Sequence, residues 1–253
     1  MTQPIPRPFS ARQHAIALDR AILGFLRHWL LIFNVLWGIF VTLPWLAPVL
    51  MQTGHESAAR AIYFFYSHQC HQLPQRSFFL FGPKAMYSLS KIQAAWVDTN
   101  QPVLLRQFIG KPELGWKVAW SDRMVGMYTS IFVAGLLYAL VRRRLKPLPV
   151  WTLPLFILPL FIDGSTHLVS DFAGIGNGFR DSNTWLAAIT GNVLPTWFYA
   201  GDALGSFNSW LRLITGTLLG VGVVWFIYPH FERLMGESGD GLEAKLRRTD
   251  VIT

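Results

Sequence analysis

Residues 30–50 read LLIFNVLWGIFVTLPWLAPVL, a stretch without a charged side chain. About twenty such residues, wound as a helix, cross a hydrocarbon layer about 30 Å thick. Three later stretches have a similar composition, from Met124 to Leu140, from Val150 to about Val169, and from Trp210 to Tyr228. The sequence therefore predicts an all-α, polytopic membrane protein with about four transmembrane helices.

The composition of the whole chain agrees with this prediction. Of its 253 residues 52% are hydrophobic and 14% are charged, which is more apolar than a soluble domain of this size needs to be. The formal net charge of +8 could indicate a nucleic-acid partner. However, Lys and Arg are scattered over terminal and loop segments and form no stripe among stacking aromatic residues. We therefore expect a lipid bilayer as the partner, and no nucleic acid.

Basic residues next to the spans predict the orientation of the chain. The short connection from Arg142 to Lys146 carries four positive charges and no acid, and short basic loops stay on the cytoplasmic side. We therefore expect a multi-pass protein of the inner, cytoplasmic membrane with both termini in the cytoplasm. The expected division is an amphipathic arm at 1–28, a four-span membrane domain at 29–228 with an outer loop at 51–123, and a charged tail at 229–253.

A further apolar run, residues 58–81, is interrupted by polar residues. It contains the only cysteine of the chain in the order His68-Gln-Cys-His-Gln72, followed by Pro74 and Arg76. Because polar groups at bilayer depth must face protein or water, we expect a short broken or re-entrant helix that skirts the outer leaflet and breaks near Pro74. Residues 82–120 are rich in Gly and Pro turn signals and are predicted to be loop and short helices outside the membrane.

This topology brings the polar residues of the spans to one side of the membrane. Counted from the basic loop, Asp122 and Arg123 lie at the outer end of the second span, and Asp163 and His167 at the outer end of the third. Arg212 lies at the outer start of the fourth. We therefore predict a pocket there, with these ligand-binding residues: His68, Cys70, His71, Gln72, Arg76, Asp122, Arg123, Asp163, His167 and Arg212.

Three of these residues could hold a transition metal such as zinc. Cys70, His71 and His167, together with an aspartate, offer sulfur, nitrogen and oxygen ligands. Their spacing is not diagnostic, because neighbouring side chains on a helix diverge by about 100°. The alternative is a structural network in which the same side chains form hydrogen bonds with helix ends and loop carbonyls.

Arginines and aspartates occur together in the outer segments: Arg76, Arg123, Arg180 and Arg212 with Asp122, Asp163, Asp171, Asp181 and Asp202. A guanidinium group binds phosphate through two parallel hydrogen bonds, which favours an anionic lipid headgroup as ligand. Ions at membrane depth are usually matched with one another, which favours pairing within the protein. The two interpretations can hold together.

One short segment is repeated. Asn183-Thr-Trp-Leu-Ala-Ala-Ile-Thr-Gly191 returns as Asn208-Ser-Trp-Leu-Arg-Leu-Ile-Thr-Gly216. The match suggests a local duplication. The alternative is two similar helix starts, in which Asn caps the helix, Trp sits at the membrane interface, and Thr and Gly allow close helix contact.

Several motifs together resemble a known family. CHQLPQRSF from Cys70 to Phe78, then Arg123 in the second span, Asp163-Gly164 in the third and Asn208 in the fourth are similar, in order, to the bacterial and archaeal membrane family called domain of unknown function 2085. The resemblance covers roughly residues 60–222. It is greatest with the longer form from green non-sulfur bacteria, in which the stretch 172–205 is extra.

This chain departs from the family pattern at Ser121 and Met124, where the family usually has cysteines. If common members bind a soft metal with three thiols and a histidine, this chain cannot do so in the same way. The family name states that no activity is assigned, so the resemblance implies a fold and little chemistry.

Three functions remain open at this point. The leading hypothesis is an integral membrane protein that binds a small polar ligand, a metal ion or a lipid headgroup, in the outer pocket. The second is a metal-assisted membrane enzyme acting on a lipid or quinone-like substrate. Adjacency of Cys70 and His71 is weak support for it, and the sequence has neither Gly-x-Ser-x-Gly nor His-Glu-x-x-His. The third is a structural subunit of a membrane complex.

Overall fold

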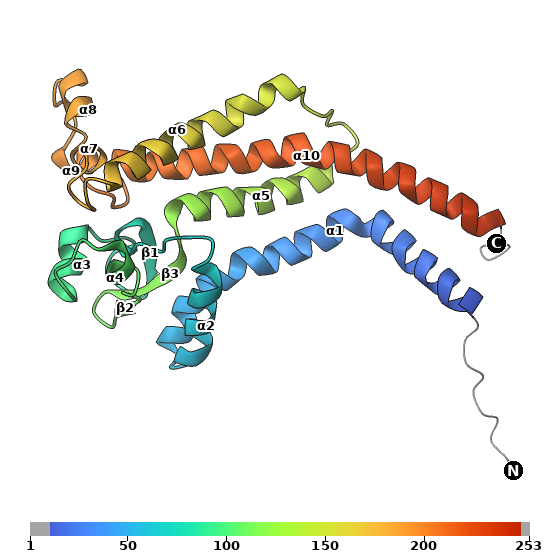
Figure 1. Cartoon of the computed structure of the whole chain (residues 1–253), viewed down its shortest axis with the longest axis horizontal. Helices are drawn as coiled ribbons and strands as arrows, with labels where there is room; N and C mark the ends of the chain where they lie inside the picture. Colours follow the sequence, from blue (N-terminus) through green and yellow to red (C-terminus); the bar gives the residue numbers. More distant parts are fainter. Residues whose placement is uncertain (1–10, 249–253) are drawn as a thin grey trace, which may run out of the picture.

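Long helices dominate the computed structural model, which describes residues 11–248 (Figure 1). Within those residues, four helices are long and apolar enough to cross a membrane. They are α1 (Ala11–Gln52), α5 (Asp122–Val141), α6 (Leu153–Asp171), which follows the short 3₁₀ helix η2 (Val150–Thr152), and α10 (Phe207–Arg248). The prediction of an all-α, polytopic membrane protein with about four transmembrane helices is confirmed.

Two of these helices extend well beyond the predicted spans. α1 includes the described part of the predicted arm and continues without a break into the first span, and α10 carries the predicted tail as far as Arg248. The two extensions lie at the same end of the molecule (Figure 1). Arg27 of α1 forms an ion pair with Asp240 of α10 at 2.7 Å. The remaining parts of the arm and tail, residues 1–10 and 249–253, lie outside the described residues.

α10 is the centre of the bundle and packs against α1, α5 and α6. Glycines make this packing close. A Cβ added at Gly220 would lie 1.9 Å from Oγ of Ser130 in α5, and one at Gly222 would lie 2.4 Å from the Phe156 ring in α6. Because small residues allow helix backbones to approach one another, these positions fix α5 and α6 against α10.

Residues 53–121 and 172–206 gather at the end of the bundle opposite the helix extensions, and we call this region the cap (Figure 1). Its helices are α2 (Glu56–Tyr66), the 3₁₀ helix η1 (Pro74–Arg76), α3 (Leu89–Ala95), α4 (Pro102–Leu105), α7 (Phe179–Ser182), α8 (Thr184–Ile189) and α9 (Thr196–Tyr199). α2 ends before the cysteine cluster, so the chain leaves the helix earlier than the predicted break near Pro74.

The described part of the cap also contains a three-stranded antiparallel sheet that was not predicted. Its strands are β1 (Ser77–Leu80), β2 (Gly110–Lys111) and β3 (Gly115–Ser121), in the order β1-β3-β2. The Trp120 ring of β3 packs against Tyr66 of α2 and Phe40 of α1, with centroids 5.2 and 5.4 Å apart. β3 continues directly into α5 without a connecting loop, so the sheet is joined directly to the second span.

The two asparagines of the repeated segment meet in the cap. Nδ2 of Asn183 donates to Oδ1 of Asn208 at 3.2 Å, and Nδ2 of Asn208 donates to the backbone oxygen of Arg180 at 2.6 Å. Asn183 precedes α8 but its side chain forms no capping bond to that helix, and the Asn208 side chain bonds to Arg180, Asn183 and Gly201 instead of the start of α10. The helix caps of the second interpretation are therefore not formed. The amide groups instead tie the loop around α7 to the beginning of α10.

Candidate functional site

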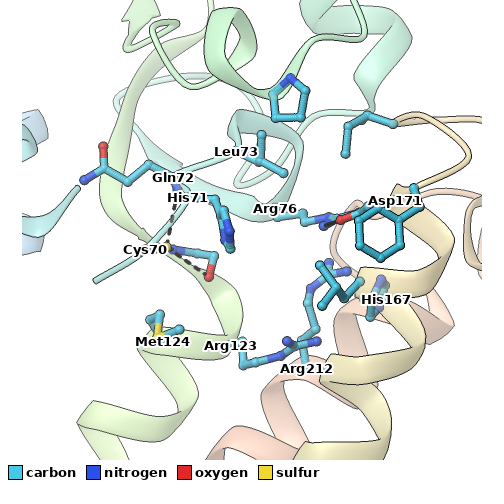
Figure 2. Close-up of a pocket in the computed structure, with 16 residues that line it drawn as sticks. Cys70, His71, Gln72, Leu73, Arg76, Arg123, Met124, His167, Asp171 and Arg212 are labelled. Carbon is cyan, nitrogen blue, oxygen red and sulfur yellow. Dashed lines mark hydrogen bonds and ion pairs between the residues drawn. The ribbon is translucent and has the colours of Figure 1, made fainter. Parts of the chain in front are cut away.

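A cavity of about 340 Å³ lies between the cap and the adjoining ends of α5, α6 and α10. Figure 2 shows cap side chains at His71 and Arg76 facing helix side chains at Arg123, His167 and Arg212. Of the ten predicted ligand-binding residues, these line the cavity: Cys70, His71, Gln72, Arg76, Arg123, His167 and Arg212. The predicted convergence of these residues is therefore present, and their binding of a ligand stays a prediction.

The other predicted residues have different places. Asp122 and Asp163 are buried and bind arginine side chains. His68 is exposed, and its Nδ1 lies 3.0 Å from the backbone oxygen of Phe64, one turn earlier in the chain. His68 therefore belongs to the end of α2 and not to the cavity.

One chain of ion pairs joins the cap to α5 and α10. Arg76 donates two hydrogen bonds of 2.8 Å to Asp171 and a third of 2.8 Å to Asp202. Arg212 donates to the other oxygen of Asp202 at 2.6 Å and to both oxygens of Asp122 at 2.7 and 2.9 Å. Negative and positive side chains thus alternate along this chain, from Asp171 in α6 to Asp122 in α5. Each carboxylate accepts a hydrogen bond from at least one guanidinium group.

Burial and these partners act in opposite directions on the extramembrane members of the chain. Burial alone would lower the pKa of Arg76, but the charges of Asp202 and Asp171 outweigh it and raise that pKa. Burial alone would raise the pKa of Asp202, but Arg76 and Arg212 outweigh it and lower that pKa. Both groups therefore stay charged at neutral pH.

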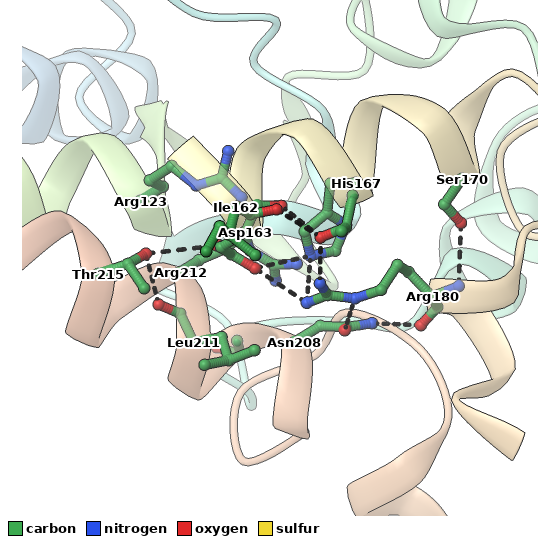
Figure 3. A network of polar contacts seen from close by, with 12 residues as sticks. Arg123, Ile162, Asp163, His167, Ser170, Arg180, Asn208, Leu211, Arg212 and Thr215 are labelled. Carbon is green, nitrogen blue, oxygen red and sulfur yellow. Dashed lines mark hydrogen bonds and ion pairs between the residues drawn. The ribbon is translucent and has the colours of Figure 1, made fainter. Parts of the chain in front are cut away.

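A second set of contacts lies within the bundle around Asp163 (Figure 3). Its carboxylate accepts from Arg123 at 2.8 Å, from Arg180 at 2.9 Å and from the Thr215 hydroxyl at 3.3 Å. Arg180 also donates to Nε2 of His167 at 3.1 Å. Arg180 comes from α7. The sequence analysis named it among the outer arginines but not among the predicted pocket residues.

The prediction that the outer arginines pair with aspartates is confirmed. Within the described residues, each of the four arginines has an aspartate partner, and these partners are Asp122, Asp163, Asp171 and Asp202. Asp181 differs, because its carboxylate accepts from the backbone N–H of Gly178 at 2.9 Å. The arginines and their partners therefore carry no net charge as a group.

Two buried donors at the cavity are left without a partner. The Nε–H of Arg123 forms no hydrogen bond with any described residue. A guanidinium group has donors only, so Nε2 of His167 must accept from Arg180, and the ring proton must be on Nδ1. That Nδ1–H is also buried without a partner in residues 11–248. Both side chains line the same cavity, so two buried donors without acceptors belong to its wall.

Cys70 is held by weak hydrogen bonds at the cavity wall. Its Sγ accepts from the backbone N–H of Gln72 at 3.3 Å and of Ser121 at 3.4 Å, and lies 3.5 Å from Oγ of Ser121. Met124 lines the cavity nearby (Figure 2). The two positions at which this chain departs from the family pattern thus lie beside Cys70. Among the described residues there is no group of three or more His, Cys, Asp or Glu that could hold a metal ion.

Lys117 is a buried lysine that the sequence analysis did not single out. Its side chain is completely buried in β3, and Nζ donates to the backbone oxygens of Gln72 at 2.8 Å and Arg106 at 2.6 Å. Burial lowers its pKa to about 7. These bonds hold the cysteine-bearing loop against the sheet. An alternation of polar and apolar residues would have marked Lys117 as exposed, whereas β3 is buried on both faces.

The rim of the cavity on α6 is apolar and exposed. Leu168 and Phe172 line the cavity and have exposed fractions of 56% and 80%. Leu73 and Ile175 form further apolar wall from the cap side. α6 is one of the candidate spans, so this rim adjoins the end of an apolar helix. The cavity thus combines polar side chains with an exposed apolar margin.

Comparison with known proteins supports the family resemblance. The model of the family described as Predicted membrane protein (DUF2085) matches residues 113–200. An uncharacterized protein of the archaeon Methanocaldococcus jannaschii is 27% identical over 160 residues, which are 60% of this chain and 76% of that protein. No solved structure matches the chain. The family model covers β3, α5 and α6, and thus the residues that these elements contribute to the cavity.

Proposed function

We propose that this membrane protein of the DUF2085 family binds the headgroup of a membrane lipid in the cavity between cap and bundle. The observation that carries the proposal is the pair of buried, unpartnered donors, the Nε–H of Arg123 and the Nδ1–H of His167. Leaving a buried donor without an acceptor costs about 1–3 kcal/mol, so such groups in a cavity favour a ligand that supplies acceptors.

The chemistry of the cavity narrows the ligand class. Arg123, His167 and the exposed His71 at its wall can all donate to an acceptor oxygen, such as that of a phosphate. The exposed apolar rim at Leu168 and Phe172 favours a ligand whose remainder lies in the bilayer. A phospholipid has both parts, because its phosphate oxygens accept hydrogen bonds and its acyl chains are apolar.

The catalytic alternative has less support. Nε2 of His167 carries the lone pair of the neutral imidazole, and it already accepts a hydrogen bond from Arg180. His167 therefore cannot act as a general base without first losing that bond. The hydrogen bonds of Cys70 are with Gln72 and Ser121. Its thiol therefore has no histidine or carboxylate as a hydrogen-bond partner among the described residues.

For the orientation we propose that the cavity faces the non-cytoplasmic leaflet of the inner membrane. The basic loop from Arg142 to Lys146 joins α5 to α6 at the end of the bundle that lies away from the cavity. Short basic loops of this kind stay in the cytoplasm. The termini would then be cytoplasmic as well, because the extensions of α1 and α10 lie at that same end (Figure 1).

Native mass spectrometry tests the headgroup proposal. The full chain would be released from nanodiscs that contain equal amounts of phosphatidylglycerol and phosphatidylcholine, and retained lipid would be counted. We expect preferential retention of phosphatidylglycerol. Arg123→Gln removes a charged donor, and we expect about a tenfold or greater loss of that retention. Retention of both lipids that is unchanged in Arg123→Gln would contradict the proposal.

Two further variants control this experiment. His71→Ala alters an exposed side chain with no hydrogen bond in the described part of the chain, so it should fold normally and still weaken retention. Arg143→Gln removes an exposed positive charge at the opposite end of the bundle and should leave retention unchanged. If Arg143→Gln lowers retention as much as Arg123→Gln does, general charge and not the cavity attracts the lipid.

A further inference from the structure

A second cleft, of about 540 Å³, lies in the cap on the other side of η1. Its lining is rich in amide, hydroxyl and carboxylate side chains, and within the described residues it contains no Lys, Arg or aromatic side chain. Apart from Ile175, it shares no lining residue with the proposed lipid site. Arg76 lines the first cavity, Asp202 lines the second, and the two side chains form an ion pair. Ile175 lines both spaces. These residues therefore form the wall between the two spaces.

Gln75 supplies the observation that points to a ligand. This side chain lines the cleft and is 1% exposed, and neither its Nε2 nor its Oε1 has a hydrogen-bond partner among residues 11–248. An amide buried in this way leaves two donors and an acceptor unsatisfied. A buried polar side chain of this kind normally has a partner in the protein, in water or in a ligand. The cleft has the size of a small-molecule pocket, which is far more than one water needs.

The remaining polar groups restrict what that ligand can be. At the cleft the carboxylates of Asp98 and Asp181 can only accept hydrogen bonds, whereas the amide N–H groups of Gln75 and Asn177 can only donate them. A cation would satisfy only the carboxylates, and an anion would satisfy only the amides while facing carboxylates. A hydroxyl group both donates and accepts, so a ligand with several hydroxyls satisfies both sets.

We propose that this cleft binds a polyhydroxylated ligand, a saccharide, through Gln75 and the side chains around it. The saccharide can be free or can be the headgroup of a glycolipid, since the chemistry of recognition is the same. The inference does not rest on the proposed lipid function, and the Arg76–Asp202 wall allows each site to be tested without altering the other.

Thermal unfolding with defined probes tests the inference. The full chain must be purified in an amine-oxide detergent, because maltoside and glucoside detergents are themselves saccharides. Methyl glucoside, methyl galactoside, methyl mannoside and maltose are then titrated, with putrescine and inorganic phosphate as the cationic and anionic probes. We expect at least one saccharide to raise the unfolding temperature in a saturable manner, with no such effect from putrescine or phosphate.

Variants then place the binding in the cleft. Gln75→Leu keeps the buried volume similar but removes the amide, and we expect about a tenfold or greater loss of saccharide affinity. Should that variant fold poorly, Asn177→Ala alters an exposed residue of the same cleft and should weaken binding as well. Gln107→Ala, an exposed amide outside the cleft, should bind as the unaltered protein does.

The outcomes are distinct. Absence of a saturable response to every saccharide, or an equal response in the Gln75→Leu and Asn177→Ala variants, overturns the inference and leaves a water-filled cleft. A response to putrescine alone or to phosphate alone overturns it in favour of a charged ligand. Stronger binding of nanodiscs that contain a glucosyl lipid than of free methyl glucoside identifies a glycolipid as the source. Phosphatidylglycerol retention should be normal in Gln75→Leu, so failure of either site is recognised separately.

Discussion

Ion pairs join helices at both ends of the bundle, but the two sets lie in different surroundings. At the cap end, Arg212 is 2% exposed and both its partners, Asp122 and Asp202, are buried. At the other end, the side chains of Arg27 and Asp240 are 39% and 75% exposed. Water screens the exposed pair, whereas a charge left alone at the buried site has neither water nor a counter-ion. The same residue types should therefore contribute very differently to stability.

The largest effect is expected at the buried set. Arg212→Met leaves Asp122 buried with only the Ser209 hydroxyl and the backbone N–H of Arg123 as donors, and we expect a loss of about 3–5 kcal/mol in the free energy of unfolding. Denaturant unfolding in detergent measures it. A loss below about 1 kcal/mol, comparable with a surface pair, would show that the buried set is not the stronger one.

Lys117 sharpens the comparison, because it is a buried cation at the cap end whose Nζ bonds go to backbone carbonyls and not to a carboxylate. Burial lowers its pKa from 10.5 to about 7, with smaller effects from Cys70 and Arg106 in opposite directions. Between these two pH values the unfolded chain binds more protons than the folded protein. Folding stability should therefore rise as pH increases from 7 toward 10, by up to about 1.4 kcal/mol per pH unit.

The control for this pH dependence is Lys117→Met, which removes the titrating group. Thermal unfolding of both proteins between pH 7 and pH 9 should give a rising curve for the unaltered chain and a flatter one for the variant. Parallel curves would mean that Lys117 titrates near the ordinary lysine value, and that its burial does not disfavour the charged form.

The smallest effect is expected at the exposed pairs. Arg27→Gln removes contacts with Asp240 and Glu243, and we expect a small decrease in the unfolding temperature at low salt that vanishes in about 1 M NaCl, where the screening length is about 3 Å. Lys245→Gln, which breaks the contact with Asp19, should behave in the same way. A decrease that persists at high salt would contradict the contrast between the two ends.

The sequence predicted the spans because long uncharged runs are a sufficient signal for a helix in a bilayer. It predicted the meeting of Arg123, His167 and Arg212 because the ends of crossing helices must fall at one of two surfaces. The same signal could not show that α1 and α10 continue beyond the membrane, since charged residues end a span without ending a helix. The sheet was missed because β3 is buried on both faces and has no alternating pattern.

Individual side chains in irregular backbone were the hardest to place. His68 is only two residues from Cys70, yet it turns back onto α2, because the helix ends at Tyr66 and the next residues form a turn. Gln75 is a single polar residue between a proline and an arginine, and only its burial without partners makes it notable. Spacing rules for helices and strands give no direction for side chains in such segments.

The central claim is that the donors of Arg123 and His167 receive a lipid headgroup in the cavity. Photo-crosslinking tests it most directly, with a phosphatidylglycerol analogue that carries a diazirine near its glycerol backbone and with adducts located by mass spectrometry. The account predicts adducts concentrated at the apolar rim, on Leu168 and Phe172, and their loss in Arg123→Gln. Adducts spread equally over other exposed apolar positions such as Leu137 and Leu140, and unchanged by Arg123→Gln, would contradict it.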